Sequence, residues 1–266
     1  YGEDCKPILR KAYFYYSNPK ISGHRYRQFK IPKKSGKTRT IHAPVKGLKT
    51  IQKCLNLALQ CVHEPHAAAM GFVPGKSIAD NAARHTGKNY VYNLDLKDFF
   101  PSIRRKRFKA VLGFPPFNMK EGSREVVAFH ISNLCCTKLE VERRNEDGEW
   151  IRRDEDVLPQ GAPTSPTITN IVCQQLDFKL SRLAHKNGAT YTRYADDITF
   201  SSQQSLFARE SKFLKAVYGI IDQQGFEIQP DKVRLQKPGY RQEVTGLVVN
   251  EKVNVTRRYV KQIRMY

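Results

Sequence analysis

Apolar residues at helical spacing predict two long helices in the chain. The first lies between Pro44 and Pro65, and the second follows Pro166 and ends at Asn187-Gly188. The apolar positions of the first are Leu48, Ile51, Leu55, Leu59 and Val62. Those of the second are Ile168, Ile171, Val172, Leu176 and Leu180.

Strand-type patterns surround a short acidic break. Residues 191–194 and 198–201 are rich in β-branched and aromatic side chains and flank Ala195-Asp196-Asp197. This pattern predicts a tight hairpin with its carboxylates at the tip. Residues 90–95 have the composition of a separate strand, which ends in Asp95.

Shorter elements complete the predicted order. We expect a hairpin at residues 30–40, an exposed hairpin at 140–156, and helices at 80–85, 205–223 and 256–266. An edge strand is expected within residues 226–235, and another strand within 243–250. The order strand, helix, hairpin, helix, strand predicts an α+β fold, in which helices cover one face of an antiparallel sheet.

Composition adds a strong positive charge. The 266 residues include 46 Lys plus Arg and 25 Asp plus Glu, so the formal net charge is +21. The chain is 40% hydrophobic and 11% aromatic, which excludes intrinsic disorder. A surplus of this size predicts binding to a polyanion, because neutralised phosphates release counterions.

Other patterns define the expected compartment. No apolar run reaches the roughly 18–20 residues of a membrane span, and the first residues lack a signal-peptide pattern, so a cytoplasmic protein is expected. The six cysteines form no Cys-x-x-Cys pair, and we interpret them as reduced thiols that lie mostly in the core.

The carboxylates are the strongest chemical signal. Two adjacent carboxylates repel by about 4 kcal/mol at about 4 Å and an effective dielectric constant of about 20. An antiparallel sheet could bring Asp95 beside Asp196 and Asp197, and three carboxylates would then hold hard cations, with Mg²⁺ preferred where phosphates and waters complete the coordination. A pair of such ions supports phosphoryl transfer. Taken alone, Asp196-Asp197 is more typical of an ordinary turn than of a metal site.

Five motifs in order extend this interpretation. Tyr194-Ala195-Asp196-Asp197 resembles the catalytic hairpin of reverse transcriptases. Residues 93–103 and 158–166 resemble the family's first catalytic motif and its template and nucleotide contact motif. Residues 225–232 and 31–39 resemble the motif that follows the hairpin and the fingers motif that grips the triphosphate.

Two short elements resemble the bacterial retron group. They are the Asn-Ala-x-x-His of Asn81 to His85 and the triplet Val244-Thr245-Gly246, and the resemblance assigns Asn81, His85 and the triplet to RNA binding. For His85, a structural role as a hydrogen-bonded histidine in a helix is an alternative to RNA binding. Reverse transcriptases of group II introns, of CRISPR systems and of other phage-defence systems share the core and remain alternatives.

The resemblance implies roles for the acidic residues and their neighbours. Asp95 and Asp196 would bind two Mg²⁺ ions, or Mn²⁺ in their place, and Asp197 would support them. Asp98 is interpreted as a turn carboxylate. Phe100, five residues after Asp95, would exclude a ribose 2′-hydroxyl by steric clash, although core packing is its alternative role.

The resemblance also implies contacts to the dNTP. Lys33, Lys34 and Arg39 would neutralise its phosphates, with Arg39 offering a planar fork. Gln160 and Gly161 would pack against the forming base pair, and glycine permits close backbone approach. Lys232 would protonate the leaving pyrophosphate, unless it is an exposed edge-strand lysine.

As a whole, the resemblance implies a right-hand polymerase fold with most of the thumb missing. The expected parts are fingers (1–90), first palm strand (91–112), a fingers–palm connection with the exposed hairpin (113–157), palm (158–250) and the start of the thumb (251–266). The implied activity is RNA-directed DNA synthesis on a structured non-coding RNA, giving short RNA-linked DNA, with a defence effector as a further partner. A non-catalytic RNA-binding scaffold is the alternative from another functional class.

Overall fold

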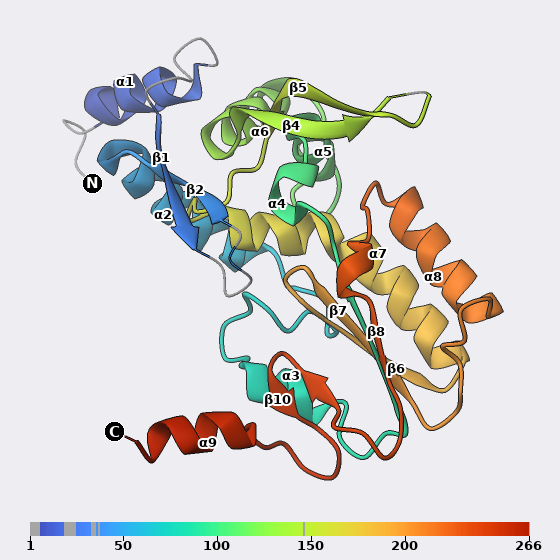
Figure 1. Ribbon diagram of the computed structural model, residues 1–266. Helices are drawn as coiled ribbons and strands as arrows, with labels where there is room; N and C mark the ends of the chain where they lie inside the picture. Colours follow the sequence, from blue (N-terminus) through green and yellow to red (C-terminus); the bar gives the residue numbers. More distant parts are fainter. Residues whose placement is uncertain (1–5, 19–24, 33–35, 37, 146, 266) are drawn as a thin grey trace. The chain divides into compact units, whose positions relative to one another are not determined.

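The computed structural model describes residues 6–18, 25–32, 36, 38–145 and 147–265 (Figure 1). The chain divides into two units. One comprises Tyr1–Glu64 and Phe100–Val172, and the other comprises Pro65–Phe99 and Cys173–Tyr266. This division does not test the predicted boundaries of fingers and palm, which stay predictions.

The first unit contains most of the helices before residue 173. They are α1 (Lys6–Ser17), α2 (Lys46–Val62), α4 (Phe99–Ser102), α5 (Arg105–Leu112), α6 (Gly122–Cys135) and the first part of α7 (Ser165–Lys186). Two antiparallel hairpins accompany them: β1 (Tyr26–Pro32) with β2 (Thr38–Pro44), and β4 (Thr137–Arg144) with β5 (Trp150–Val157). The predicted helix after Pro44 and both predicted hairpins are thereby confirmed.

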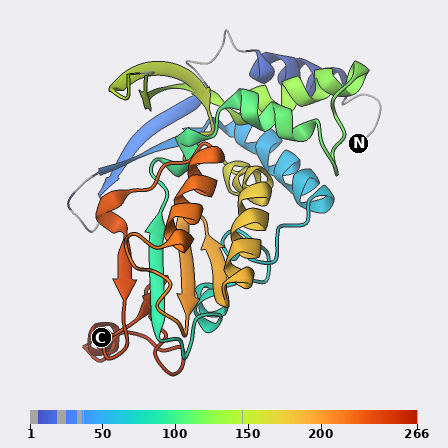
Figure 2. The ribbon, with the colours of Figure 1, turned by 90° about the vertical axis from the view of Figure 1, so that its right-hand side faces the viewer.

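The second unit is built on a four-stranded antiparallel sheet in the order β6-β7-β3-β8. Its strands are β3 (Tyr90–Asp95), β6 (Ala189–Tyr194), β7 (Asp197–Ser202) and β8 (Arg234–Gln236). Figure 2 shows α8 (Lys212–Gln223) and the C-terminal part of α7 on one face of this sheet. Phe200, Leu176 and Val217 are fully buried. The predicted antiparallel sheet covered on one face by helices is confirmed.

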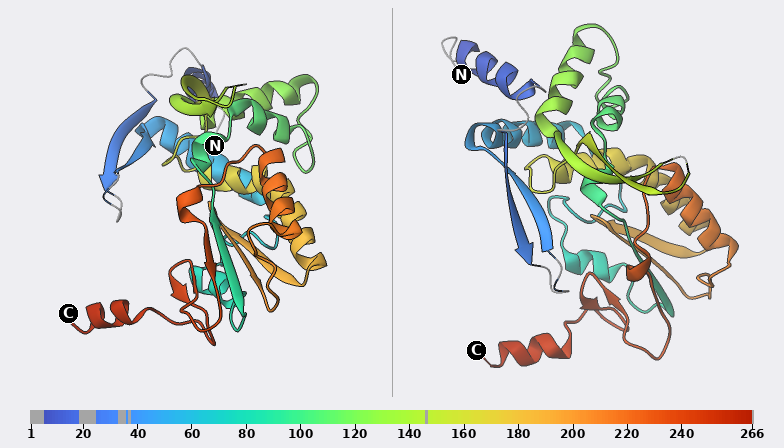
Figure 3. Two further views of the ribbon diagram at one scale, coloured as in Figure 1. Left: turned by 45° about the vertical axis from the view of Figure 1, so that its right-hand side comes forward. Right: turned by 45° about the horizontal axis from the view of Figure 1, so that its top comes forward.

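Smaller elements complete the second unit. They are α3 (Ile78–Ala83), the 3₁₀ turn η3 (Pro230–Lys232), the short strands β9 (Glu243–Val244) and β10 (Leu247–Val248), and α9 (Arg257–Ile263). The helix α3 begins at a capping box, in which Ser77 and Asp80 bond each other's backbone amides. Figure 3 shows α9 set apart from the sheet at the C-terminal end.

Three predicted elements need correction. The helix expected from Ser205 begins only at Lys212, because the Ser211 hydroxyl accepts from the Leu214 amide and caps it there. The edge strand expected within 226–235 is confirmed as β8, the outermost strand of the sheet, but it covers only the end of that range and extends to Gln236. The strand expected within 243–250 is a two-stranded hairpin, because Thr245 and Gly246 have φ of +48° and +82° and turn the chain.

The cysteine prediction is correct for part of the chain. Cys135, Cys136 and Cys173 are buried free thiols, but Cys54 and Cys61 are exposed on α2. Cys5 lies outside the described residues. Among the helices that the structure describes, none is both long enough and apolar enough to cross a membrane.

Candidate active site

Strand register brings the predicted acidic residues together in the second unit. Asp95, the last residue of β3, lies opposite Asp197, the first residue of β7. Asp196 occupies the turn between β6 and β7, and its carbonyl accepts from the Leu96 amide at 3.0 Å. The backbone carbonyl of Asp95 accepts from the Gln229 amide at 2.8 Å, which fixes the end of β3 to the segment before η3. The predicted convergence of Asp95 with the hairpin tip is confirmed.

Three negative charges lie close together at this end of the sheet, with Lys232 as a cationic neighbour. Desolvation raises the pKa of Asp197 to about 7, and repulsion from Asp196 and Asp95 adds to the shift, although Lys232 opposes it. Asp197 nevertheless keeps an exposed surface, so solvent screens part of this repulsion. The Lys232 Nζ donates to the Asp95 Oδ2 at 2.7 Å, and Asp95 is only 8% exposed. The lysine predicted near the leaving group therefore lies at the carboxylates.

The donor chemistry fits a divalent cation. Carboxylate oxygens are the ligands that hard cations prefer, and burial, followed by repulsion from Asp196 and Asp95, raises the pKa of Asp197, so a nearby cation would favour its charged form. Among the described residues, no three acidic, histidine or cysteine side chains already have the spacing of a metal site. Binding would therefore require rotation of the carboxylates and exchange of the Lys232 contact at Asp95.

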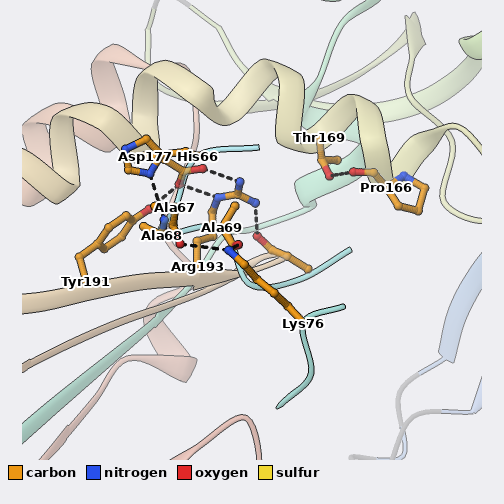
Figure 4. A network of polar contacts seen from close by, with 11 residues as sticks. His66, Ala67, Ala68, Ala69, Lys76, Pro166, Thr169, Asp177, Tyr191 and Arg193 are labelled. Carbon is orange, nitrogen blue, oxygen red and sulfur yellow. Dashed lines mark hydrogen bonds and ion pairs between the residues drawn. The ribbon is translucent and has the colours of Figure 1, made fainter. Parts of the chain in front are cut away.

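A buried arginine, Arg193, bonds the backbone of the turn that carries Asp196. Ala195 has φ of +59°, a conformation that non-glycine residues rarely adopt, and the Arg193 Nη1 donates to its carbonyl at 3.1 Å. Arg193 is fully buried. Asp177 on α7 accepts from the Arg193 Nε at 2.8 Å and from its Nη2 at 2.6 Å (Figure 4). Sequence reasoning missed this pair, although an arginine between Thr192 and Tyr194 in a predicted strand was a usable signal.

A loop packs beside the same turn. The amides of Met70 and Gly71 donate to the Arg193 carbonyl. The Lys76 ammonium donates to the carbonyls of Ala67 and Ala69 (Figure 4). A Cβ at Gly71 would lie 2.5 Å from the Ala195 nitrogen, so only glycine permits this approach. Sequence reasoning did not select this loop.

Two segments that carry residues predicted to contact the dNTP are bonded to each other in the first unit. The Gln160 carbonyl accepts from the His42 amide at 2.8 Å, which joins its loop to β2, the strand that carries the exposed Arg39. Gly161 has φ of +116°, and a Cβ there would lie 2.6 Å from the Ile41 side chain. Lys33 and Lys34 lie outside the described residues.

Phe99 and Phe100, the two residues after Asp98, differ in their burial. Phe99 is buried and packs against the Phe226 ring, with centroids 5.9 Å apart. Phe100, the candidate sugar gate, lies in α4 and is partly buried. Asp98 is exposed with φ of +45°, which fits the turn interpretation.

The two retron-type elements form one structural unit. Asn81 on α3 is buried, and its Nδ2 donates to the Thr245 hydroxyl at 3.5 Å. Val244 and Ala82 share a small apolar cluster, which joins α3 to the β9–β10 hairpin. Gly246 completes the turn after Thr245. These residues are thus neighbours in space, and their role in RNA binding stays a prediction.

His85 is a buried histidine with both nitrogens occupied. Its Nδ1 lies 2.7 Å from the Ser201 hydroxyl and its Nε2 lies 2.7 Å from the Thr192 hydroxyl. The ring is 0% exposed, so it has no surface to offer RNA in this structure. We therefore assign His85 a structural role and propose that any effect on RNA is indirect, through α3.

We expect acid to destabilise the protein through His85. Burial, with smaller contributions from Lys88 and Arg84, lowers its pKa from 6.5 to about 3. Between these values the unfolded chain binds a proton that the folded protein does not, so stability falls as the pH falls. At pH 5 the loss is about 2 kcal/mol. Asp197, whose pKa is raised to about 7, acts in the opposite direction over the same range, so the two contributions offset each other in the wild type. The difference between wild type and H85Q, in urea unfolding at pH 7 and pH 5, therefore measures the His85 contribution; an equal pH dependence of the two proteins contradicts the assignment.

Comparison with known proteins agrees with this geometry. The family model of reverse transcriptases (RNA-dependent DNA polymerases) matches residues 31–249. The retron Mx162 reverse transcriptase of Myxococcus xanthus is 38% identical, over 97% of this chain and 55% of that protein. The retron Ec86 reverse transcriptase of Escherichia coli is 33% identical, over 90% of this chain and 68% of that protein. The chain spans about half the length of its Myxococcus relatives.

Solved structures show the same fold. Telomerase from Candida albicans, in complex with the TWJ fragment of telomeric RNA, superposes with a TM-score of 0.58 at 13% identity, over 95% of this chain and 50% of that one. Apo telomerase from Candida tropicalis, truncated from the C-terminal domain, gives 0.56 at 13% identity, over 90% and 56%. The predicted polymerase fold is confirmed. The chain therefore belongs to the reverse transcriptase family and is of the retron type.

Proposed function

We propose that this protein is an RNA-directed DNA polymerase that extends a primer hydroxyl with dNTPs. The observation that carries the proposal is the register that sets Asp95 opposite Asp197, with Asp196 in the adjoining turn. Three carboxylates at one end of a polymerase sheet, in a chain of charge +21, are suited to bring anionic substrates and cations together.

Divalent cations are the proposed cofactors. Reverse transcriptases generally use them, and here Asp95, Asp196 and Asp197 would hold two Mg²⁺, or Mn²⁺ in their place. Bound ions would activate the attacking hydroxyl and offset charge on the leaving oxygen. Lys232, already paired with Asp95, would supply a proton to the departing pyrophosphate.

The first unit would hold the nucleotide. Arg39, with Lys33 and Lys34, would bind its phosphates, and the Gln160-Gly161 loop would pack under the new base pair. Support comes from the hydrogen bond between Gln160 and His42, which keeps the loop next to the strand of Arg39.

The proposed template is a structured non-coding RNA. The charge of +21 suits RNA, and the relatives are retron reverse transcriptases. Asn81, Val244, Thr245 and Gly246 would form part of the RNA contact. The product would be short RNA-linked DNA (msDNA) made in the bacterial cytoplasm, with a defence effector as partner and antiphage defence as the setting.

Incorporation of labelled dNTPs on an RNA template-primer tests this function. The expected result is extension that requires a divalent cation and stops with EDTA. Tight RNA binding without any extension would instead favour the non-catalytic scaffold.

We expect F100A to admit ribonucleotides. An aromatic ring under the sugar leaves no room for a 2′-hydroxyl, and a clash discriminates more strongly than a lost contact. Removal of the ring should lower the preference for dNTP over rNTP by about 100-fold. Ratios of kcat/KM for dCTP and CTP on one template measure it, and an unchanged ratio removes Phe100 from the gate role.

A further inference from the structure

The helix turn α4, which carries Phe100, lies beside the β4–β5 hairpin and is bonded to it (Figures 1 and 3). The Arg143 Nη2 on β4 donates to the carbonyl of Pro101 at 2.6 Å. Pro101 is the residue next to Phe100, so the guanidinium holds the backbone directly beside the candidate sugar gate.

Glu155 on β5 fixes that arginine. Its Oε2 accepts from the Arg143 Nε at 2.9 Å and from the Arg104 Nε at 2.9 Å. The side chains of Arg143 and Glu155 are only 15% and 16% exposed. Solvent therefore screens this pair little, and its charge-assisted hydrogen bond fixes the orientation of the guanidinium.

Backbone contacts join the same two segments. The Leu158 amide donates to the Ile103 carbonyl at 3.0 Å, and Arg104 bridges to Val157. The segment after Phe100 is thus bonded to the end of β5 through its backbone as well as through the contact of Arg104 with Glu155. A displacement of the hairpin base would move α4 with it.

The opposite face of the hairpin carries a more exposed ion pair. Arg152 and Glu142 lie 3.7 Å apart and are 69% and 46% exposed. Successive strand residues point to opposite faces, so this pair lies away from the face of Arg143. It provides a matched control on the same hairpin.

We propose that Arg143 and Glu155 are positioning residues that hold α4, and with it Phe100, and thereby set the discrimination between deoxyribonucleotides and ribonucleotides. This inference rests on the proposed function and on Phe100 as the gate. Steric exclusion depends on the ring's position within tenths of an ångström, so a gate that loses its support becomes permissive. Arg143 bonds Glu155 and Pro101 through one planar fork, which lysine cannot reproduce.

Primer extension with R143K, E155Q, F100A and the control R152K tests the inference. We expect R143K and E155Q to lower the dNTP-over-rNTP ratio of kcat/KM by about 10-fold, whereas R152K should match the wild type. In the F100A background, R143K should have no additional effect, because it acts through the same ring. A purely structural role would lower the melting temperature without changing the ratio.

The outcomes separate the inference from the proposed function. If R143K and E155Q retain the wild-type ratio while F100A relaxes it, the inference is overturned and the polymerase function stands. An additive effect of R143K in the F100A background, or an unchanged ratio in F100A, also overturns it. If the wild type incorporates no dNTP at all, the proposed function itself fails.

Discussion

D196N abolishes nucleotide incorporation and leaves RNA binding intact: this is the result we expect from the proposed active site. Asp196 lies in the turn beside the Asp95–Asp197 register pair, and asparagine has the same shape without the charge. Loss of one anionic metal ligand at a site of phosphoryl transfer should reduce the extension rate by at least about 10³-fold. Single-nucleotide extension and a filter-binding assay on the same RNA measure the two properties.

D98N is the matched control for that variant. Asp98 is also an aspartate near the catalytic strand, but it is exposed, and its φ of +45° suits asparagine as well as aspartate. Its extension rate should stay near that of the wild type. Extension by D196N at the wild-type rate would show that the hairpin carboxylates do no chemistry. Equal losses in both variants would point to a general effect of removing negative charge.

Local pattern was sufficient for the elements that place the carboxylates. Alternating β-rich residues around Ala195-Asp196-Asp197 predicted the β6–β7 hairpin, and the apolar run before Asp95 predicted β3. Antiparallel pairing then left few ways to arrange them. The site was predictable because its residues stand at strand ends, where register alone decides which carboxylates meet.

Tertiary packing decided what local pattern could not. Phe207 falls within the helix predicted for residues 205–223, but its ring lies in a non-helical segment against Tyr92 and Phe213, with centroids 5.4 and 5.6 Å away. Arg193 is a charged residue that would ordinarily be expected at the surface, and its burial requires Asp177, sixteen residues earlier on another element. Contacts of this kind depend on the assembled fold.

D177A should strongly destabilise the protein. Arg193 and Asp177 are 0% and 1% exposed, and Asp177 also accepts from the Tyr191 hydroxyl at 2.7 Å. Burial alone would lower the pKa of Arg193, but Asp177 outweighs it and raises that pKa. Removing the carboxylate leaves a buried cation without this partner, which costs about 3–5 kcal/mol of a total stability of about 5–15 kcal/mol. Urea unfolding measures the loss, and D222A, at an exposed site on α8, should change stability by less than about 0.5 kcal/mol.

The double variant D177L/R193M shows what the pair contributes beyond stability. Apolar residues of similar volume leave no buried charge, so the double variant should be more stable than D177L or R193M alone. It also lacks the Arg193 bond to the Ala195 carbonyl, in the turn that presents Asp196. If that bond orients the turn, the double variant folds but extends primers about 10-fold more slowly than the wild type, with RNA binding unchanged. A double variant that folds and extends at the wild-type rate would limit the pair to the core, whereas losses that simply add would contradict the charge-pairing explanation.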